Sequence, residues 1–484
     1  MEERYIASID LGTAKFGLCV ARVKGNDVQI VYYKETPSDG IRTSVVANPM
    51  KATLPLKAAV REAEEELMIK IMQVVIGMPR NDVQQVTATG KIIRTNPDEY
   101  ISEEEVESLK SMALEQYPLD DPASQIMYGT VAQSFSIDDQ IQLVESDVVG
   151  TLSETLEGNF KVFIGSRRAT TAVDKVFNSM GIAIAKKYFL PDVVAKTVLS
   201  NEDRYNGVAL MDIGAGVTSV SIYHRGIMRY YAAIPFGGRT ITNDIRTECS
   251  ISEEMSEKVK LRFGACLPGK LASLSEKVLH IYEGDNNHEV SVKFLSEVID
   301  SRCREIIEAV LWYIQESGLQ NNLRGGIVLT GGGANLVNLA GLVKEMSGYE
   351  VRTGFPRHLF STSVGTGVYN PSATSAIGMV LAAKDDRMPD CVTKPEVPLT
   401  PFVDIPEPAA EEPVDPGETP FQMPEEALES GTTGELLAPE EFGPAVEPVK
   451  ERKPRKNSGL RIFWTKLKDG AKEKIIDIYD DYNN

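Results

Sequence analysis

One strand pattern occurs twice in this chain, and this repeat constrains the possible folds more than any other feature. The two copies read YIASIDLGTAKFGLCVARVKGNDVQIVYYKETP and GVALMDIGAGVTSVSIYHRGIMRYYAAIPFGG. Each copy predicts a strand ending in Asp-x-Gly, a tight turn, a second strand, a polar turn and a third strand. Because a sequence duplication repeats a structural unit, we expect two similar lobes facing each other across a cleft.

Strand-like and helix-like runs alternate through residues 1–385, which predicts an α/β fold. The expected strands are residues 5–10, 16–23, 28–34, 73–77, 160–165, 208–212, 219–224, 227–235 and 326–330. The expected helices include residues 54–69, 169–180, 238–249, 252–263, 294–317 and 336–346.

The first hairpin of each copy has an aspartate at its mouth, Asp10 in one and Asp212 in the other. Two carboxylates cannot bind a phosphate directly. They can hold a hydrated Mg²⁺ that bridges phosphate oxygens. The paired motif therefore predicts a Mg²⁺–phosphate site between the lobes, although a single Asp-Gly turn would be an ordinary hairpin signal.

The turns after these aspartates carry the groups that could hold the phosphates. Gly12 and Gly214 allow the backbone to approach a ligand with no Cβ in the way. Exposed N–H groups in such turns form an anion-binding concavity. Thr13 and Thr218 can add hydroxyl donors, and Lys15 can add a positive charge.

A third candidate element is the segment GGIVLTGGGANLVNLAGL, residues 325–342. An apolar strand leads into Gly331, Gly332 and Gly333 and then into an expected helix, whose N-terminal N–H groups would face an anion. The run also allows an adenine or a ribose to lie against bare backbone. A plain strand–turn–helix connection is the alternative.

The C-terminal part changes composition abruptly. Residues 390–449 contain 15 acidic residues, one basic residue and 12 of the 26 prolines, which is typical of an extended linker. Residues 450–474 contain ten basic and three acidic residues. A helical stripe of apolar residues favours a peripheral membrane anchor over a packed helix or a docking peptide; its main members are Leu460, Phe463, Trp464, Leu467, Ile475 and Ile478.

Charge and cysteine content exclude several classes of protein. A formal net charge of −19 argues against a nucleic-acid partner. The five cysteines are widely spaced and form no CxxC pair, which favours a reducing cytoplasm over a disulfide framework or a zinc site. The acidic N-terminus is unlike a signal peptide, and no apolar run is long enough to span a bilayer.

In this order, the motifs resemble the actin, sugar-kinase and heat-shock-chaperone ATPase superfamily, and within it the FtsA family of bacterial actin-like cell-division proteins. The segments that carry the resemblance are SIDLGTAKFGLCVA, MDIGAGVTSVSIYHRGIMRYYAAIPFGGRTITNDI, GIVLTGGGANLVNLAGL and PSATSAIGMVLAA. An insertion at residues 82–162 resembles the extra subdomain, called 1C, of that family. The acidic linker and the terminal amphipathic helix also fit it.

The resemblance implies that ATP and Mg²⁺ bind between the lobes, with Asp10 and Asp212 at the metal. The implied phosphate contacts are Asp10, Gly12, Thr13, Lys15, Asp212, Gly214, Ala215, Gly216 and Thr218. The implied adenosine contacts are Gly331, Gly332, Gly333, Glu257 and Lys260. The last two could instead form a solvated pair on a helix surface.

The resemblance also implies binding of the C-terminal peptide of FtsZ by the helix FLSEVIDSRCREIIEAVLWYI, with Arg302 and Glu305 at matching positions. A charged helix surface is the alternative interpretation of these two residues. Downstream division proteins would bind the inserted subdomain.

One departure concerns ATP hydrolysis. Fast superfamily ATPases orient the attacking water with a Gln or Glu beside a proline, whereas this chain has Leu190 before Pro191, with Asp192 after it. Ala215 also stands where relatives often have glycine. We therefore expect nucleotide binding with weak or absent hydrolysis.

The resemblance implies an actin-like ATPase fold and a protein that tethers the FtsZ ring to the cytoplasmic face of the plasma membrane at the division site and polymerises head to tail. The expected parts are 1–81 and 163–198 (lobe 1), 82–162 (insertion), 199–385 (lobe 2), 386–450 (linker) and 451–484 (membrane helix). Three alternatives stay open: a pilus or secretion assembly ATPase homologue, a metabolic kinase and a chaperone.

Overall fold

The computed structural model describes residues 3–393, except for 139, 272–273, 275 and 284–285. Two of its sheets repeat one strand order. In the first sheet the order is β12-β7-β1-β2-β3-β20, and in the second it is β15-β14-β13-β18-β19. In both sheets the first three strands in sequence form an antiparallel meander, and two parallel strands extend the sheet on the side of the first strand. The predicted α/β class and duplication are confirmed.

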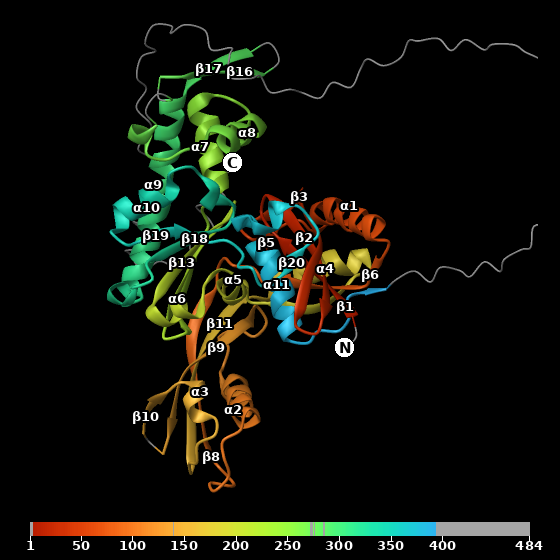
Figure 1. Cartoon of the computed structure of the whole chain (residues 1–484), viewed down its shortest axis with the longest axis vertical. Coiled ribbons are helices and arrows are strands. Elements are labelled where there is room, and N and C mark those ends of the chain that lie inside the picture. Colours follow the sequence, from red (N-terminus) through yellow and green to blue (C-terminus); the bar gives the residue numbers. More distant parts are fainter. Residues whose placement is uncertain (1–2, 139, 272–273, 275, 284–285, 394–484) are drawn as a thin grey trace, which may run out of the picture. The chain divides into compact units, whose positions relative to one another are not determined.

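The first sheet adds one short strand to this common core. Its strands are β1 (Glu3–Leu11), β2 (Lys15–Lys24), β3 (Asp27–Pro37), β7 (Gln73–Gly77), β12 (Ala183–Tyr188) and β20 (Ser361–Thr362). Figure 1 shows α1 (Pro49–Leu67) and α4 (Arg167–Met180) beside this sheet, and both contribute to one apolar core. The helix α1 begins where the side chain of Asn48 accepts a hydrogen bond from the N–H of Lys51.

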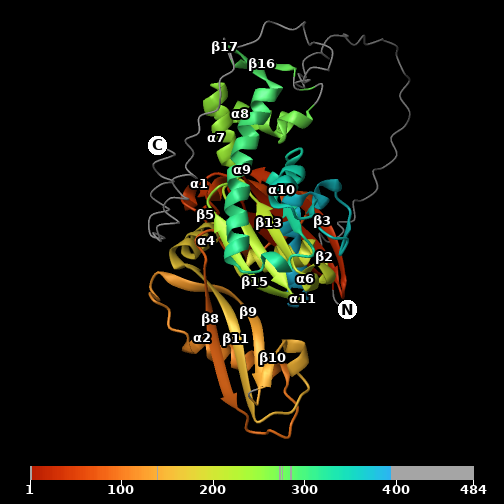
Figure 2. The ribbon, with the colours of Figure 1, turned by 90° about the vertical axis from the view of Figure 1, so that its left-hand side faces the viewer.

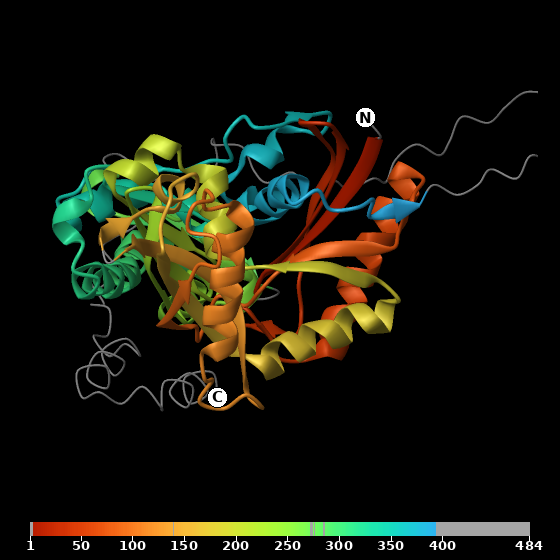
Figure 3. The same ribbon diagram turned by 90° about the horizontal axis from the view of Figure 1, so that it is seen from below.

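On its other face the first sheet packs against α11 (Thr374–Asp385). Figure 3 shows this helix in blue beside the red strands β1–β3, and the hydroxyl of Ser8 on β1 donates to the carbonyl of Ala376 at 2.8 Å. The short strand β20 pairs with β3. Residues 361–385, which the sequence assigned to lobe 2, therefore pack on the first sheet.

The second sheet is formed by β13 (Val208–Ile213), β14 (Thr218–His224), β15 (Ile227–Ile234), β18 (Ile327–Thr330) and β19 (Val351–Thr353). Its helices are α5 (Leu190–Val198), α6 (Asn201–Asn206), α7 (Gly238–Cys249), α8 (Glu253–Phe263), α9 (Val292–Glu316) and α10 (Leu339–Ser347). The helix α5 packs against α11, and a Cβ on Gly378 would lie 2.5 Å from the hydroxyl oxygen of Thr197.

The insertion forms its own sheet, with the order β10-β9-β11-β8. It consists of β8 (Gln84–Ile93), α2 (Glu103–Gln116), β9 (Gln125–Ile137), β10 (Gln140–Leu143), α3 (Glu145–Val148) and β11 (Thr155–Ser166). Figure 2 shows these strands and α2 in orange. The strand expected at residues 160–165 belongs to this sheet rather than to lobe 1, because the whole of β11 pairs with β8 and β9.

Three small two-stranded sheets complete the described part. They are β4 (Ile41–Arg42) with β5 (Val45–Val46), β6 (Lys70–Ile71) with β21 (Val392–Thr393), and β16 (Val278–Glu283) with β17 (Asn286–Ser291). Within the described residues, no helix has the length and apolar character needed to cross a membrane. The membrane residues predicted from sequence, from Leu460 to Ile478, lie outside these residues.

Candidate functional site

Two hairpin loops occupy equivalent positions in the two sheets. In the first, Leu11 pairs with Phe16, and in the second, Ile213 pairs with Thr218. The intervening residues 12–15 and 214–217 close both hairpins in the same register. A Cβ on the first loop residue, Gly12, would lie 2.5 Å from the carbonyl oxygen of Lys15, so the tight turn requires glycine there.

The two loops meet. A Cβ on Gly216 would lie 2.7 Å from the hydroxyl oxygen of Thr13. That hydroxyl accepts a hydrogen bond from the N–H of Ser44, at 3.1 Å. The hydroxyl of Thr218 is buried and has no hydrogen-bond partner among the described residues, which leaves a polar atom for a ligand near the second loop. The expectation that both loops contribute to one site fits this geometry.

The two aspartates lie close to a residue that the sequence analysis missed. The guanidinium of Arg80 donates to Asp212 Oδ2 at 2.5 Å, and its other nitrogen is 4.0 Å from Asp10 Oδ1. It also donates to the hydroxyl of Ser375. Burial raises the pKa of the Asp10 carboxyl above its ordinary value, the Arg80 charge opposes this rise, and the Asp212 charge adds to it.

A signal for Arg80 was present in the sequence. It follows β7, a buried strand that runs parallel to β1. The carboxyl ends of parallel strands meet at one edge of a sheet. Recognising the pairing of β7 with β1 would therefore have placed Arg80 near Asp10.

The glycine run packs directly against the second loop. Gly331 has a φ of 80°, and a Cβ there would lie 2.4 Å from Asp212 Oδ1. A Cβ on Gly333 would lie 2.4 Å from the side chain of Ile213, whereas one on Gly332 would meet only Ser372, at 3.9 Å. Gly332 is therefore the member of the run with open space beside it.

The sequence analysis expected the glycine run to lead directly into a helix, and this expectation is wrong. Residues Gly332–Asn335 form a 3-10 turn, and α10 begins only at Leu339. Asn338 adopts a left-handed conformation, with a φ of 64°, and separates the two. The N-terminus of α10 therefore does not directly follow the glycines.

Lys260 is buried and connects α8 to α7. Its ammonium donates to the carbonyl of Gly238 at 2.9 Å, to the hydroxyl of Thr242 at 2.8 Å and to Glu257 at 2.7 Å. Burial lowers the pKa of Lys260, and the Glu257 charge opposes that shift. The N–H of Gly238 in turn donates to the carbonyl of Gly214, at 2.9 Å. These contacts join the predicted adenosine-side pair to the second loop.

Lys15, which was predicted to add positive charge at the phosphates, has a carboxylate partner of its own. It forms an ion pair with Glu35, which also accepts hydrogen bonds from Tyr33 and Ser372.

The second loop is attached to the N-terminus of α7 through Ala215. The N–H of Arg239 donates to the carbonyl of Ala215 at 2.7 Å.

Leu190 is buried, and a Cβ on Gly77 would lie 2.3 Å from its Cδ1. Asp192 forms an ion pair with Lys196 at 2.8 Å. The residue at the expected water-orienting position therefore packs in the core, and the neighbouring carboxylate has a partner of its own.

Replacing Leu190 by glutamine is expected to lower the free energy of unfolding by about 2–4 kcal/mol without creating rapid hydrolysis, because it buries an amide where apolar contacts existed. Urea unfolding and phosphate release measure the two effects. The exposed Leu54→Gln on α1 is the control and should change stability by less than about 0.5 kcal/mol. Rapid phosphate release from a stable Leu190→Gln protein would contradict this expectation.

The residues predicted to bind FtsZ form an internal ion pair. Arg302 is buried, and its guanidinium donates to both oxygens of Asp244, at 2.5 and 2.9 Å, and to Glu305 at 2.8 Å. The ion pair between Arg302 and Asp244 joins α9 to α7. A role for Arg302 in partner binding stays a prediction, and the observed contacts account for its position without a partner.

The residues at the hairpin mouths fit a hydrated divalent cation. Asp10 and Asp212 supply carboxylate oxygens, which Mg²⁺ prefers, and waters and phosphate oxygens would complete its shell. Among the described residues, no group of three or more His, Cys, Asp or Glu side chains could hold a metal ion.

Comparisons with known proteins identify one family that this chain resembles. A family model described as "Cell division protein FtsA" matches residues 209–378, which include the second loop, Lys260 and the glycine run. The cell division protein FtsA of Borreliella burgdorferi is 29% identical over 79% of this chain and 91% of the relative. The chain is similar to the FtsA cell division proteins over most of its length.

Other comparisons extend this FtsA likeness. The cell division protein FtsA of Neisseria meningitidis is 27% identical over 79% of this chain and 91% of its own length. A solved structure titled "PilM-PilN type IV pilus biogenesis complex" superposes with a TM-score of 0.55 at 15% identity, covering 78% of this chain and 98% of that one. At this identity, the likeness to the pilus protein concerns the fold alone.

Proposed function

We propose that this FtsA-like chain binds Mg-ATP between its two duplicated sheets and tethers the FtsZ ring to the cytoplasmic face of the plasma membrane. The observation that carries the nucleotide part is the meeting of two hairpin loops beside two carboxylates, the buried Asp212 and the partly buried Asp10. The similarity to cell division proteins supports the cellular role.

Each element of the site has a task in binding ATP. The N–H groups of the two loops, with Thr13 and Thr218, would hold the phosphates. Bound Mg²⁺ would supply positive charge to the phosphate oxygens. Gly332 offers bare backbone to the adenosine, and Lys260 keeps α7 and α8 in place beside the second loop.

The site is better suited to a switch than to rapid turnover. Leu190 provides no group that could orient a water, so ATP would persist in the bound state. Nucleotide that contacts both sheets favours their closed arrangement, because a ligand shifts the equilibrium toward the state it binds best. A closed protomer could then add to the next one head to tail, the type of contact that builds filaments.

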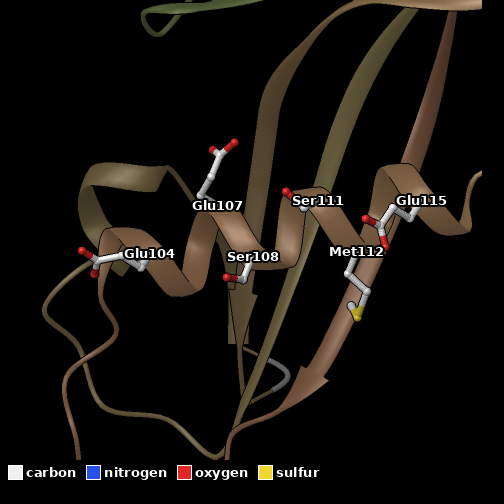
Figure 4. Close-up of a pocket in the computed structure, with 6 residues that line it drawn as sticks. All are labelled: Glu104, Glu107, Ser108, Ser111, Met112 and Glu115. Atoms are coloured by element: carbon white, nitrogen blue, oxygen red, sulfur yellow. The ribbon is translucent and has the colours of Figure 1, made fainter. Parts of the chain in front are cut away.

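The inserted subdomain is the proposed contact for downstream division proteins. Its helix α2 borders a pocket on the side away from the sheet, and Figure 4 shows the side chains that line it. These residues are Glu104, Glu107, Ser108, Ser111, Met112 and Glu115. Three carboxylates beside one thioether would favour a partner segment that is basic and partly apolar.

The terminal residues 451–484 supply the proposed membrane contact. The intact chain should pellet with vesicles of anionic lipid, and a chain truncated before Gly459 should remain in the supernatant, because the apolar stripe and its basic neighbours are lost together. Trp464→Glu in the full-length chain is the sharper variant, since it removes one large apolar group and keeps the tether. Equal pelleting of all three proteins would refute the membrane role.

The FtsZ part has its own test. A labelled C-terminal peptide of FtsZ should bind the chain, with an increase in fluorescence anisotropy, and a scrambled peptide should not. The alternative, a pilus or secretion assembly protein, is favoured only by the fold likeness to the pilus complex. Absence of both FtsZ peptide binding and membrane binding by a chain that binds ATP would favour this alternative.

A further inference from the structure

Arg80 is held in place through its backbone by both halves of the molecule. Its N–H donates to the hydroxyl of Ser44 at 3.2 Å, and its carbonyl accepts from the hydroxyl of the buried Tyr231, on β15, at 2.6 Å. Ser44 is also bound to Thr13 of the first loop. The position of the Arg80 side chain is therefore fixed by the same elements that form the two loops.

The guanidinium of Arg80 lies among the groups that would bind the cation. Its side chain is 13% exposed, and those of Asp10 and Asp212 are 20% and 8% exposed. The ion pair to Asp212 is close, and that to Asp10 is 4.0 Å long. Arg80 also donates to the hydroxyl of Ser375. These contacts place the permanent positive charge of Arg80 beside the two carboxylates.

Mg²⁺ and a guanidinium need the same carboxylate oxygens. Mg²⁺ binds proteins through one or two carboxylates together with the substrate phosphates, even when water lies between. A guanidinium that already neutralises Asp212 lowers the negative charge that attracts the ion. For the ion to gain the full charge of Asp212, Arg80 has to release this carboxylate.

We propose that Arg80 competes with Mg²⁺ for the carboxylates of Asp10 and Asp212, and so determines the Mg²⁺ concentration at which ATP binds. This inference rests on the proposed nucleotide function. Arg80 is a specificity-determining residue in this scheme: it neutralises the aspartates when Mg²⁺ is scarce and makes nucleotide binding responsive to the free ion.

The test compares the full-length chain with Arg80→Gln and Arg80→Lys. ATP affinity is measured by calorimetry across a series of Mg²⁺ concentrations. We expect the Mg²⁺ concentration that gives half-maximal affinity to fall about tenfold in Arg80→Gln, and to change less than about threefold in Arg80→Lys, which keeps the charge. Mg²⁺ alone should raise the melting temperature of Arg80→Gln more than that of the unchanged chain.

Arg94→Gln is the matched control. Arg94 is also buried and ion-paired, with Glu105, but it lies in the inserted subdomain. Its substitution should lower the melting temperature and leave the Mg²⁺ midpoint unchanged. An unchanged Mg²⁺ midpoint in Arg80→Gln would overturn the inference. Weaker ATP binding by Arg80→Gln at every Mg²⁺ concentration would also overturn it, and would indicate that Arg80 contacts the phosphates directly.

Failure of the inference and failure of the proposed function give different results. If the unchanged chain binds no ATP at any Mg²⁺ concentration, the nucleotide function itself is wrong. If it binds ATP with a clear Mg²⁺ dependence that Arg80→Gln does not shift, only the role of Arg80 is refuted.

Discussion

Replacing Asp212 by asparagine is expected to weaken Mg²⁺-dependent ATP binding by at least about 100-fold. Loss of outer-shell partners of a metal typically costs about 10–100-fold in affinity, and Asp212 is proposed to act closer to the ion. Asparagine keeps the shape of the side chain and can still accept a hydrogen bond from Arg80. The charge that draws the cation toward the second loop is lost, while the hairpin is kept.

The same substitution leaves Arg80 with a single ion pair, the longer one to Asp10, beside neutral hydrogen-bond partners such as the hydroxyl of Ser375. Removing one partner of a buried ion pair costs about 3–5 kcal/mol of stability, and the remaining partners favour the lower part of that range. Thermal or urea unfolding therefore has to accompany the binding measurement. Affinity is compared at a temperature where both proteins are folded.

Asp203→Asn is the matched control for this experiment. Asp203 also lies in the second lobe, where its carboxylate caps α6 and pairs with Arg352 at 2.9 Å, outside the two loops. Its loss should reduce stability and leave ATP affinity unchanged. Unchanged ATP affinity in Asp212→Asn at saturating Mg²⁺ would show that this carboxylate does not serve the cation.

Local sequence patterns were sufficient for much of the fold. The strand β7 and the helix α7 begin and end where the sequence predicted, and the boundaries of both hairpins are close to those expected. Apolar periodicity and the Asp-x-Gly turns report the local backbone, and in a duplicated fold one correct hairpin supports the other. The two aspartates and the glycine run were predicted together and lie together, since Gly331 packs against Asp212.

The features that sequence reasoning missed depend on contacts between distant segments. Arg80 reaches Asp212 only after the two sheets come together, and Ser375 only after α11 packs on the first sheet. Arg302 looked like an exposed helix residue, because its partner Asp244 lies on another helix. The left-handed Asn338, which delays α10, follows a pattern that would otherwise continue a helix.

Substitutions in the glycine run should separate folding from binding, and Gly331→Ala is expected to have the larger effect on stability. With a φ of 80° and a ψ of 169°, Gly331 has a backbone conformation that costs a residue with a Cβ about 1–3 kcal/mol, and overpacking adds about 1–3 kcal/mol. At Gly331 the new methyl group would approach Asp212 Oδ1 at 2.4 Å and the carbonyl oxygen of Ile213 at 2.6 Å. We expect a total loss of about 3–4 kcal/mol, measured by urea unfolding.

Gly332→Ala is the matched variant one residue away. Its backbone is not left-handed, and only Ser372, at 3.9 Å, lies within reach of a Cβ. The free energy of unfolding should therefore change by less than about 1 kcal/mol. Because the methyl group would occupy the open side of the run, where adenosine is proposed to lie, ATP affinity should fall about tenfold, which corresponds to about 1.4 kcal/mol.

Together, the variants Gly331→Ala and Gly332→Ala test the proposed adenosine contact independently of the metal. Calorimetry at fixed, saturating Mg²⁺ removes the contribution of the carboxylates and of Arg80, so a loss of affinity in Gly332→Ala has to come from the glycine run. If Gly332→Ala is stable and binds ATP as tightly as the unchanged chain, the nucleotide does not contact this face of the run. If instead it unfolds like Gly331→Ala, the open space beside Gly332 is absent in solution.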